Sequence, residues 1–141
     1  MTNSSSLLHV TLGLVALELH GRETVVPAGA FCRTRHGLGP GTPYFEDSSK
    51  PLQAALDYVD SHKEDSERTR QLQIVLRESH IRDALSLWNL IPRLDAPSRG
   101  LIFDRLAELL PPPTGVTREG IVALDPKMLE TWQPLVAQLW Q

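Results

Sequence analysis

The sequence predicts an α+β fold, in which a short N-terminal antiparallel β meander of about three to four strands precedes a mostly helical C-terminal region. Apolar and polar residues alternate before residue 36, as in half-buried strands, whereas apolar residues three and four apart recur after residue 47, as in amphipathic helices. The Gly/Pro-rich stretch 37–47 separates the two patterns. About four short strands cannot bury both faces of a sheet. We therefore expect the β part to be incomplete alone.

The strands are predicted from apolar alternation and from the residues that end it. In the first strand, residues 7–12, Leu8, Val10 and Leu12 share one face. Gly13 then allows a bend or bulge and shifts the apolar phase. Further strands are expected at residues 14–19, 23–27 and 30–35.

The helices are predicted from apolar stripes and from capping residues and prolines at their ends. We expect helices at residues 49–60, within 62–78, at 81–91 and at 97–110, a short turn at 117–124, and a last helix after residue 125. Ser49, Thr117 and Asp125 are suited to cap helix N-termini. Pro92 should end the third helix, and Pro134 should kink or break the last one.

These elements suggest a division of the chain and a set of core residues. The predicted parts are a disordered N-terminus at 1–6, the β meander at 7–36, a junction at 37–47 and a helical region at 48–141. The predicted core consists of Val10, Leu12, Val15, Leu17, Val25, Leu56, Val59, Val75, Leu76, Leu85, Trp88, Ile91, Ile102, Leu106, Leu109, Leu129, Trp132 and Val136.

Composition and charge favour a globular chain without a nucleic-acid or membrane partner. Of the 141 residues, 14 are Lys or Arg and 17 are Asp or Glu, and the two signs are interspersed rather than gathered in a basic patch. Residues 7–19 are interrupted by polar residues and lack a basic flank, so we predict neither a signal peptide nor a membrane span. The chain as given would then be cytoplasmic.

Catalytic and ligand-binding signatures are weak. Cys32 and His36 lie four residues apart, but a metal site needs three or four ligands, and a nucleophilic cysteine needs an orienting partner and a lowered pKa. The glycines of residues 37–41 lack the lysine of a phosphate-binding loop, and prolines remove amide donors there. We therefore predict no catalytic residue, no cofactor and no metal.

Several segments, taken in order, resemble a known bacterial family. They are residues 7–18, 21–30, 39–47, 83–88 and 111–120. The first two look like the closing strands of a FecR-type domain, and the others resemble the helical C-terminal region of a subset of those proteins. The resemblance implies a membrane-anchored regulator of an extracytoplasmic-function sigma factor, with an outer, periplasmic domain. This chain lacks the family's N-terminal segment, transmembrane helix and most of the β domain, so we expect it to be incomplete alone.

The favoured hypothesis is a non-enzymatic signalling or protein-interaction module of this type. Its partner would be another protein or a second copy of the chain, bound through the N-terminal strands. The candidate interaction surface consists of Leu8, Val10, Leu12 and Trp140. Two alternatives stay open, a small enzyme that uses Cys32 with His36 and a purely structural helical domain.

Overall fold

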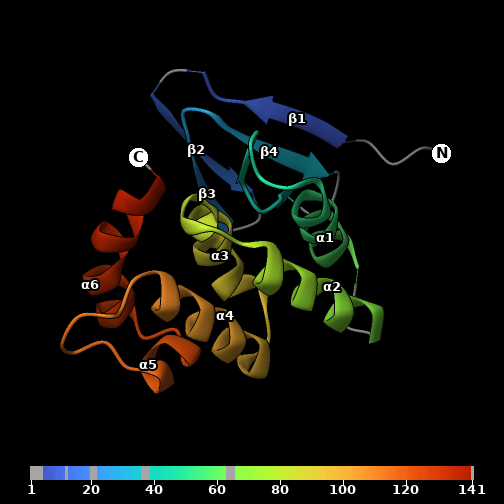
Figure 1. Ribbon diagram of the computed structural model, residues 1–141. Helices are drawn as coiled ribbons and strands as arrows, with labels where there is room; N and C mark the ends of the chain where they lie inside the picture. The colour runs from blue at the N-terminus through green and yellow to red at the C-terminus, as the bar shows by residue number, and fades with distance from the viewer. Residues whose placement is uncertain (1–4, 12, 20–21, 36–38, 63–65, 141) are drawn as a thin grey trace. The chain divides into compact units, whose positions relative to one another are not determined.

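The α+β fold class is confirmed by the computed structural model, in which strands occupy the N-terminal part and helices the rest (Figure 1). The structure describes residues 5–11, 13–19, 22–35, 39–62 and 66–140. The chain divides into two compact units, Met1–Glu78 and Ser79–Gln141, here called unit 1 and unit 2. The boundary between the units therefore lies inside the predicted helical region and not at the Gly/Pro-rich stretch.

Unit 1 contains two antiparallel sheets. In the first, β4 (Ala30–Arg35) is central, and β1 (Ser5–His9) pairs with one of its edges. The short strands β5 (Gly39–Pro40) and β6 (Tyr44–Phe45) also pair with β4, so the predicted junction contributes to the sheet. In the second sheet, β2 (Leu14–Leu19) and β3 (Arg22–Pro27) form a hairpin.

The strand order differs from a simple meander, because β1 pairs with β4 and not with β2. Beyond the end of β1, the Val10 N–H donates to the Ala30 carbonyl (3.1 Å) and the Gly29 N–H donates to the Val10 carbonyl (2.6 Å). Gly13 has φ 72°, a left-handed conformation that suits glycine and lets the chain leave β4. β1 also includes Ser5 and Ser6, which the prediction had placed in a disordered N-terminus.

The buried face of β3 was predicted wrongly. Val25 is 37% exposed, whereas its neighbours Thr24 and Val26 are buried. The register explains this, because it places Val26 opposite Val15 and Thr24 opposite Leu17. Residues directly opposite share a face, so Val15 and Leu17 lie on the face of Val26, whereas Val25 lies opposite the small Ala16 on the other face.

Two helices complete unit 1 and confirm the predicted positions. They are α1 (Lys50–Ser61) and α2 (Ser66–Glu78), which pack against each other. The predicted cap is present, since the Leu52 N–H donates to Ser49 Oγ (3.2 Å). Residues of α1 that are buried toward the core recur at helical spacing: Leu52, Ala55, Leu56 and Val59. Polar residues of α1, together with Ala54 and Leu56, line the site described below.

Unit 2 is helical. Its α-helices are α3 (Ala84–Leu90), α4 (Ala96–Leu109), α5 (Arg118–Val122) and α6 (Pro126–Ala137), and its 3₁₀ turns are η1 (Ile81–Asp83), η2 (Ile91–Arg93) and η3 (Gln138–Trp140). The helix predicted at 81–91 is thus α-helical only in its middle. Pro92 lies in the 3₁₀ turn that ends it, as expected of a residue that cannot continue the helical bonding.

The predicted starts of the last three helices in unit 2 are confirmed, and of the predicted kink or break at Pro134 the break does not occur. Asp95, Thr117 and Asp125 accept backbone N–H bonds at the starts of α4, α5 and α6. Helix α6 continues through Pro134 to Ala137. A proline removes one backbone bond, and the full burial of Trp132 and Val136 holds the helix together on both sides of it.

An aromatic cluster forms the centre of unit 2. Trp132 is fully buried, with the ring of Trp88 perpendicular to it at 5.9 Å between centroids and the ring of Phe103 at 5.3 Å. The Trp132 indole N–H has no hydrogen-bond partner among the described residues. Trp132 therefore contributes through its packing against these two rings. Among the described residues, no helix has the length and apolar character needed to cross a membrane.

Candidate functional site

Of the four predicted surface residues, three are described by the structure, two of them in unit 1 and one in unit 2. Leu8 is half-buried on β1, opposite Cys32, and Val10 is only 4% exposed, so Val10 is a core residue and not part of a surface. Leu12 lies outside the described residues. Trp140 is half-buried in η3, which belongs to unit 2, whereas β1 belongs to unit 1.

The exposed apolar residue of β1 is Leu7, which sequence reasoning missed. Its exposure is 50%, the largest in the strand among the hydrophobic residues described. Adjacent strand residues face opposite sides, so a face that buries Val10 and partly buries Leu8 leaves Leu7 on the other face. The alternation was visible in the sequence, but the Leu7-Leu8 pair fits either phase.

Cys32 is fully buried in β4, and its thiol donates to the Gly41 carbonyl at 3.3 Å. A substrate must reach a nucleophilic thiol, so this burial favours the structural interpretation of Cys32. His36, the partner in the enzymatic alternative, lies outside the described residues. Within the ranges described, no three His, Cys, Asp or Glu side chains gather as a metal site would require.

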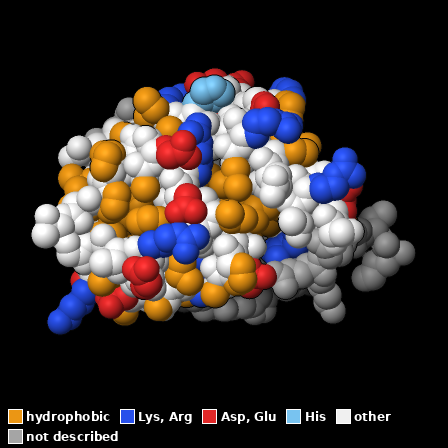
Figure 2. Space-filling model, turned by 60° about the horizontal axis from the view of Figure 1, so that its bottom comes forward, with side chains coloured by type: hydrophobic (Ala, Val, Ile, Leu, Met, Phe, Trp, Pro, Cys, Tyr) orange, Lys and Arg blue, Asp and Glu red, His pale blue; other side chains and the backbone are white. Residues whose placement is uncertain are grey.

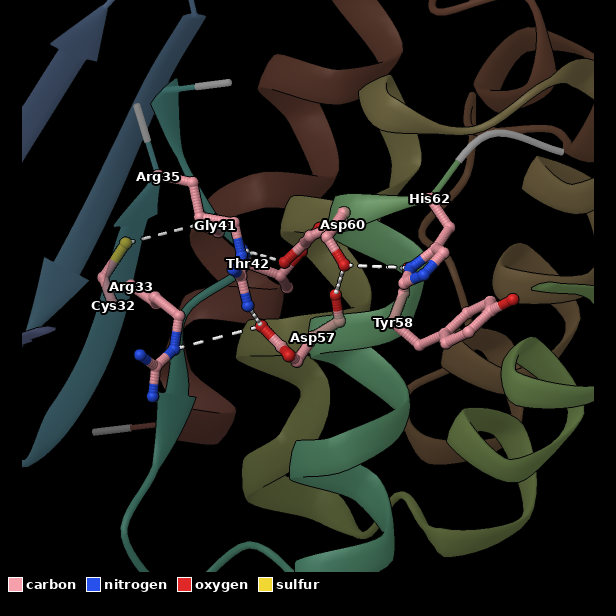
Figure 3. Close-up of polar contacts among 10 residues, drawn as sticks. Cys32, Arg33, Arg35, Gly41, Thr42, Asp57, Tyr58, Asp60 and His62 are labelled. Carbon is pink, nitrogen blue, oxygen red and sulfur yellow. Dashed lines mark hydrogen bonds and ion pairs between the residues drawn. The ribbon is translucent and has the colours of Figure 1, made fainter. Parts of the chain in front are cut away.

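A polar pocket lies in unit 1 between the strands around β4 and one side of α1. Its volume is about 310 Å³. The lining residues are Arg33, Thr42, Tyr44, Lys50, Gln53, Ala54, Leu56, Asp57 and Asp60. The α1 residues recur at spacings of three and four, so the pocket follows one side of the helix. Figure 3 shows the acidic end of this pocket, where Arg33 and Asp57 face each other.

Asp60 joins the end of α1 to the segment that follows β5. Its Oδ2 accepts the Thr42 backbone N–H at 2.7 Å, and its Oδ1 accepts the Thr42 hydroxyl at 2.8 Å (Figure 3). Thr42 is only 2% exposed, so the carboxylate supplies acceptors to two donors that water cannot readily reach. This pair of bonds fixes the wall of the pocket at its acidic end.

Asp57 lies one turn earlier on α1 and is paired with two arginines of β4. Arg35 donates to Asp57 Oδ1, and Arg33 Nε lies 3.9 Å from the same oxygen. The Asp57 side chain is 47% exposed, so solvent screens both ion pairs. Both carboxylates of the pocket thus already accept hydrogen bonds or form ion pairs within the protein.

Tyr44 and Lys50 supply further polar groups to the pocket. Burial raises the pKa of Tyr44 above its ordinary value of 10.0, and Arg33 partly opposes this. The phenol therefore keeps its proton at neutral pH. Arg33 is also a hydrogen-bond partner of Tyr44. Because a guanidinium can only donate, the Tyr44 oxygen accepts that bond and its O–H is available to donate elsewhere.

One face of the molecule carries exposed hydrophobic side chains interspersed with charges of both signs (Figure 2).

No protein-family model, curated protein or solved structure matches the chain.

Proposed function

We propose that this chain is a non-enzymatic protein-interaction module whose unit 1 associates with a second copy through the outer edge of β1. The observation that carries the proposal is that β1 is an edge strand without the residues that usually prevent edge strands from pairing. β1 is the last strand on one side of its sheet, and its sequence, SSLLH, contains no proline and no Lys, Arg, Asp or Glu. Edge strands in proteins that stay monomeric are commonly protected by such residues.

The backbone of β1 offers a pattern that can pair with itself. The Val10 N–H points toward β4, so by alternation the N–H groups of Leu8 and Ser6 also point toward β4. Those of Leu7 and His9 then point toward the free edge. Two antiparallel copies of Ser5–His9 centred on Leu7 would pair these groups around a twofold axis and cover the exposed Leu7 side chain.

The signalling part of the proposal comes from the resemblance to FecR-type regulators, carried by residues 7–18, 21–30, 39–47, 83–88 and 111–120. Strands that close a larger β domain in that family need further strands beside them. An open edge on β1 is consistent with that need, whether the added strand comes from a second copy or from another protein of the same signalling system.

Light scattering across at least a tenfold range of concentration tests the proposal. We expect the mass to rise from monomer to dimer as concentration increases. Leu7→Pro should abolish the dimer, because proline removes an N–H that points away from β4, while the β1–β4 bonds are retained. The matched control, Leu7→Ala, keeps that N–H and should still dimerise, although more weakly. A monomeric wild-type chain at every concentration would contradict self-association.

A further inference from the structure

We propose that the polar pocket of unit 1 binds a small organic monocarboxylate. The pocket is concave and open, and at about 310 Å³ it is at the lower end of the size of ligand sites. With roughly 30 Å³ for each non-hydrogen atom, as in liquid water, this volume accommodates a ligand of about ten such atoms. The proposal does not depend on association through β1.

The charges of the pocket favour an anion over a cation. Both Asp60 oxygens accept bonds from Thr42, and Asp57 is paired with Arg35 and Arg33. The ammonium of Lys50, by contrast, is exposed and has no ion pair or hydrogen bond among the described residues. The charge available to a ligand is therefore positive and lies toward the start of α1.

Three groups of the pocket lining can donate to a carboxylate. Lys50 supplies an ammonium, Arg33 a guanidinium, and Tyr44 a phenolic O–H that is free to donate. The Gln53 side-chain amide donates one of its two N–H groups to the Ser48 carbonyl at 2.8 Å, which holds this side chain at the pocket wall. Ala54 and the ring of Tyr44 offer apolar surface to the carbon skeleton of the ligand.

The balance of charge selects a monoanion over a dianion such as phosphate. Arg33 and Lys50 contribute two positive charges to the lining, and Asp57 and Asp60 contribute two negative charges. The adjacent Arg35 adds one more positive charge through its pair with Asp57. A monocarboxylate makes this group of charges neutral, whereas a dianion leaves an excess negative charge close to two carboxylates.

Titration of the full chain with benzoate, followed by amide chemical shifts, tests the proposal. We expect saturable shifts at Tyr44, Lys50 and Gln53. Lys50→Gln should weaken binding about tenfold or more, since it removes the unpaired charge. Its matched control is Lys127→Gln, which removes an exposed lysine of unit 2 and should leave the affinity unchanged. Ala54→Leu, a change of an exposed helix residue, should block the pocket without altering its charge.

Two further probes decide which chemistry the pocket recognises. Benzylamine has a similar ring with a positive charge, and it should cause no saturable shift at these residues. Inorganic phosphate should bind more weakly than benzoate. Absence of saturable benzoate binding would overturn the proposal, as would equal or tighter binding of benzylamine. Tighter binding of phosphate at the same residues would overturn the assignment to a monocarboxylate. Self-association is measured separately by light scattering, so either proposal can fail without the other.

Discussion

Unit 1 and unit 2 each contain a buried apolar core, but unit 1 adds to its core a polar contact that has no counterpart among the described residues of the aromatic centre of unit 2. In unit 1, the segment that follows β5 is joined to α1 through Asp60 and its two bonds to Thr42. In unit 2, the helices meet around Trp132, which is packed by other aromatic rings. The stability gained from the Asp60–Thr42 bonds, here called the polar tie, depends on particular acceptor atoms, whereas the stability gained from an apolar core depends on how completely its volume is filled. The two units should therefore respond differently to single substitutions.

The largest effect should follow from removing the aromatic centre of unit 2. Trp132→Ala leaves a cavity beside Trp88 and Phe103, and we expect it to lower the free energy of unfolding by about 3–5 kcal/mol. All three tryptophans belong to unit 2, so the fluorescence of the remaining two during urea unfolding reports on this unit.

The control for this substitution lies on the same helix. Leu135 is exposed, so Leu135→Ala should cost less than about 1 kcal/mol. Equal losses for the two variants would contradict the placement of Trp132 at the centre of unit 2.

An intermediate effect should follow from removing the polar tie of unit 1. Asp60→Ala leaves the Thr42 N–H and hydroxyl buried without their acceptor, which should cost about 1–3 kcal/mol. Hydrogen exchange at the Thr42 amide should become faster, because that N–H loses its partner. Asp60→Asn keeps one acceptor oxygen and should lie between wild type and Asp60→Ala. Unchanged exchange at Thr42 in Asp60→Ala would show that the tie does not form in solution.

The same contrast explains what the sequence could predict. The helices of unit 2 were predicted well because their signals are local: Thr117 and Asp125 cap the helices that they precede, and Pro92 lies at the end of its helix. The helix does not break at Pro134, because burial of the residues around it, which is a tertiary effect, outweighs the local rule.

The sequence was less informative about unit 1, where the important contacts are long-range. In the sequence, Asp60 is only the last residue of a predicted helix, and nothing near it in the chain indicates that Thr42 is its partner. The β5 and β6 strands are too short to give an alternating pattern. The face of β3 depended on its register with β2, which adjacent valines at 25 and 26 leave undecided. The pocket is formed by these same contacts, so its residues could not be grouped from the sequence.

The smallest loss of stability should follow from changing Asp57. This change compares the half-exposed ion pair of unit 1 with the buried bonds between Asp60 and Thr42. This carboxylate is half-exposed and pairs with Arg35, so Asp57→Asn should cost less than about 1 kcal/mol at low salt. Screening should shrink the difference further at high salt, which urea unfolding at two salt concentrations would measure. A double-mutant cycle with Arg35→Gln isolates the pair. If Asp57→Asn proved as costly as Asp60→Ala at both salt concentrations, the ion pair and not the Thr42 tie would be the main polar contact between α1 and the strands.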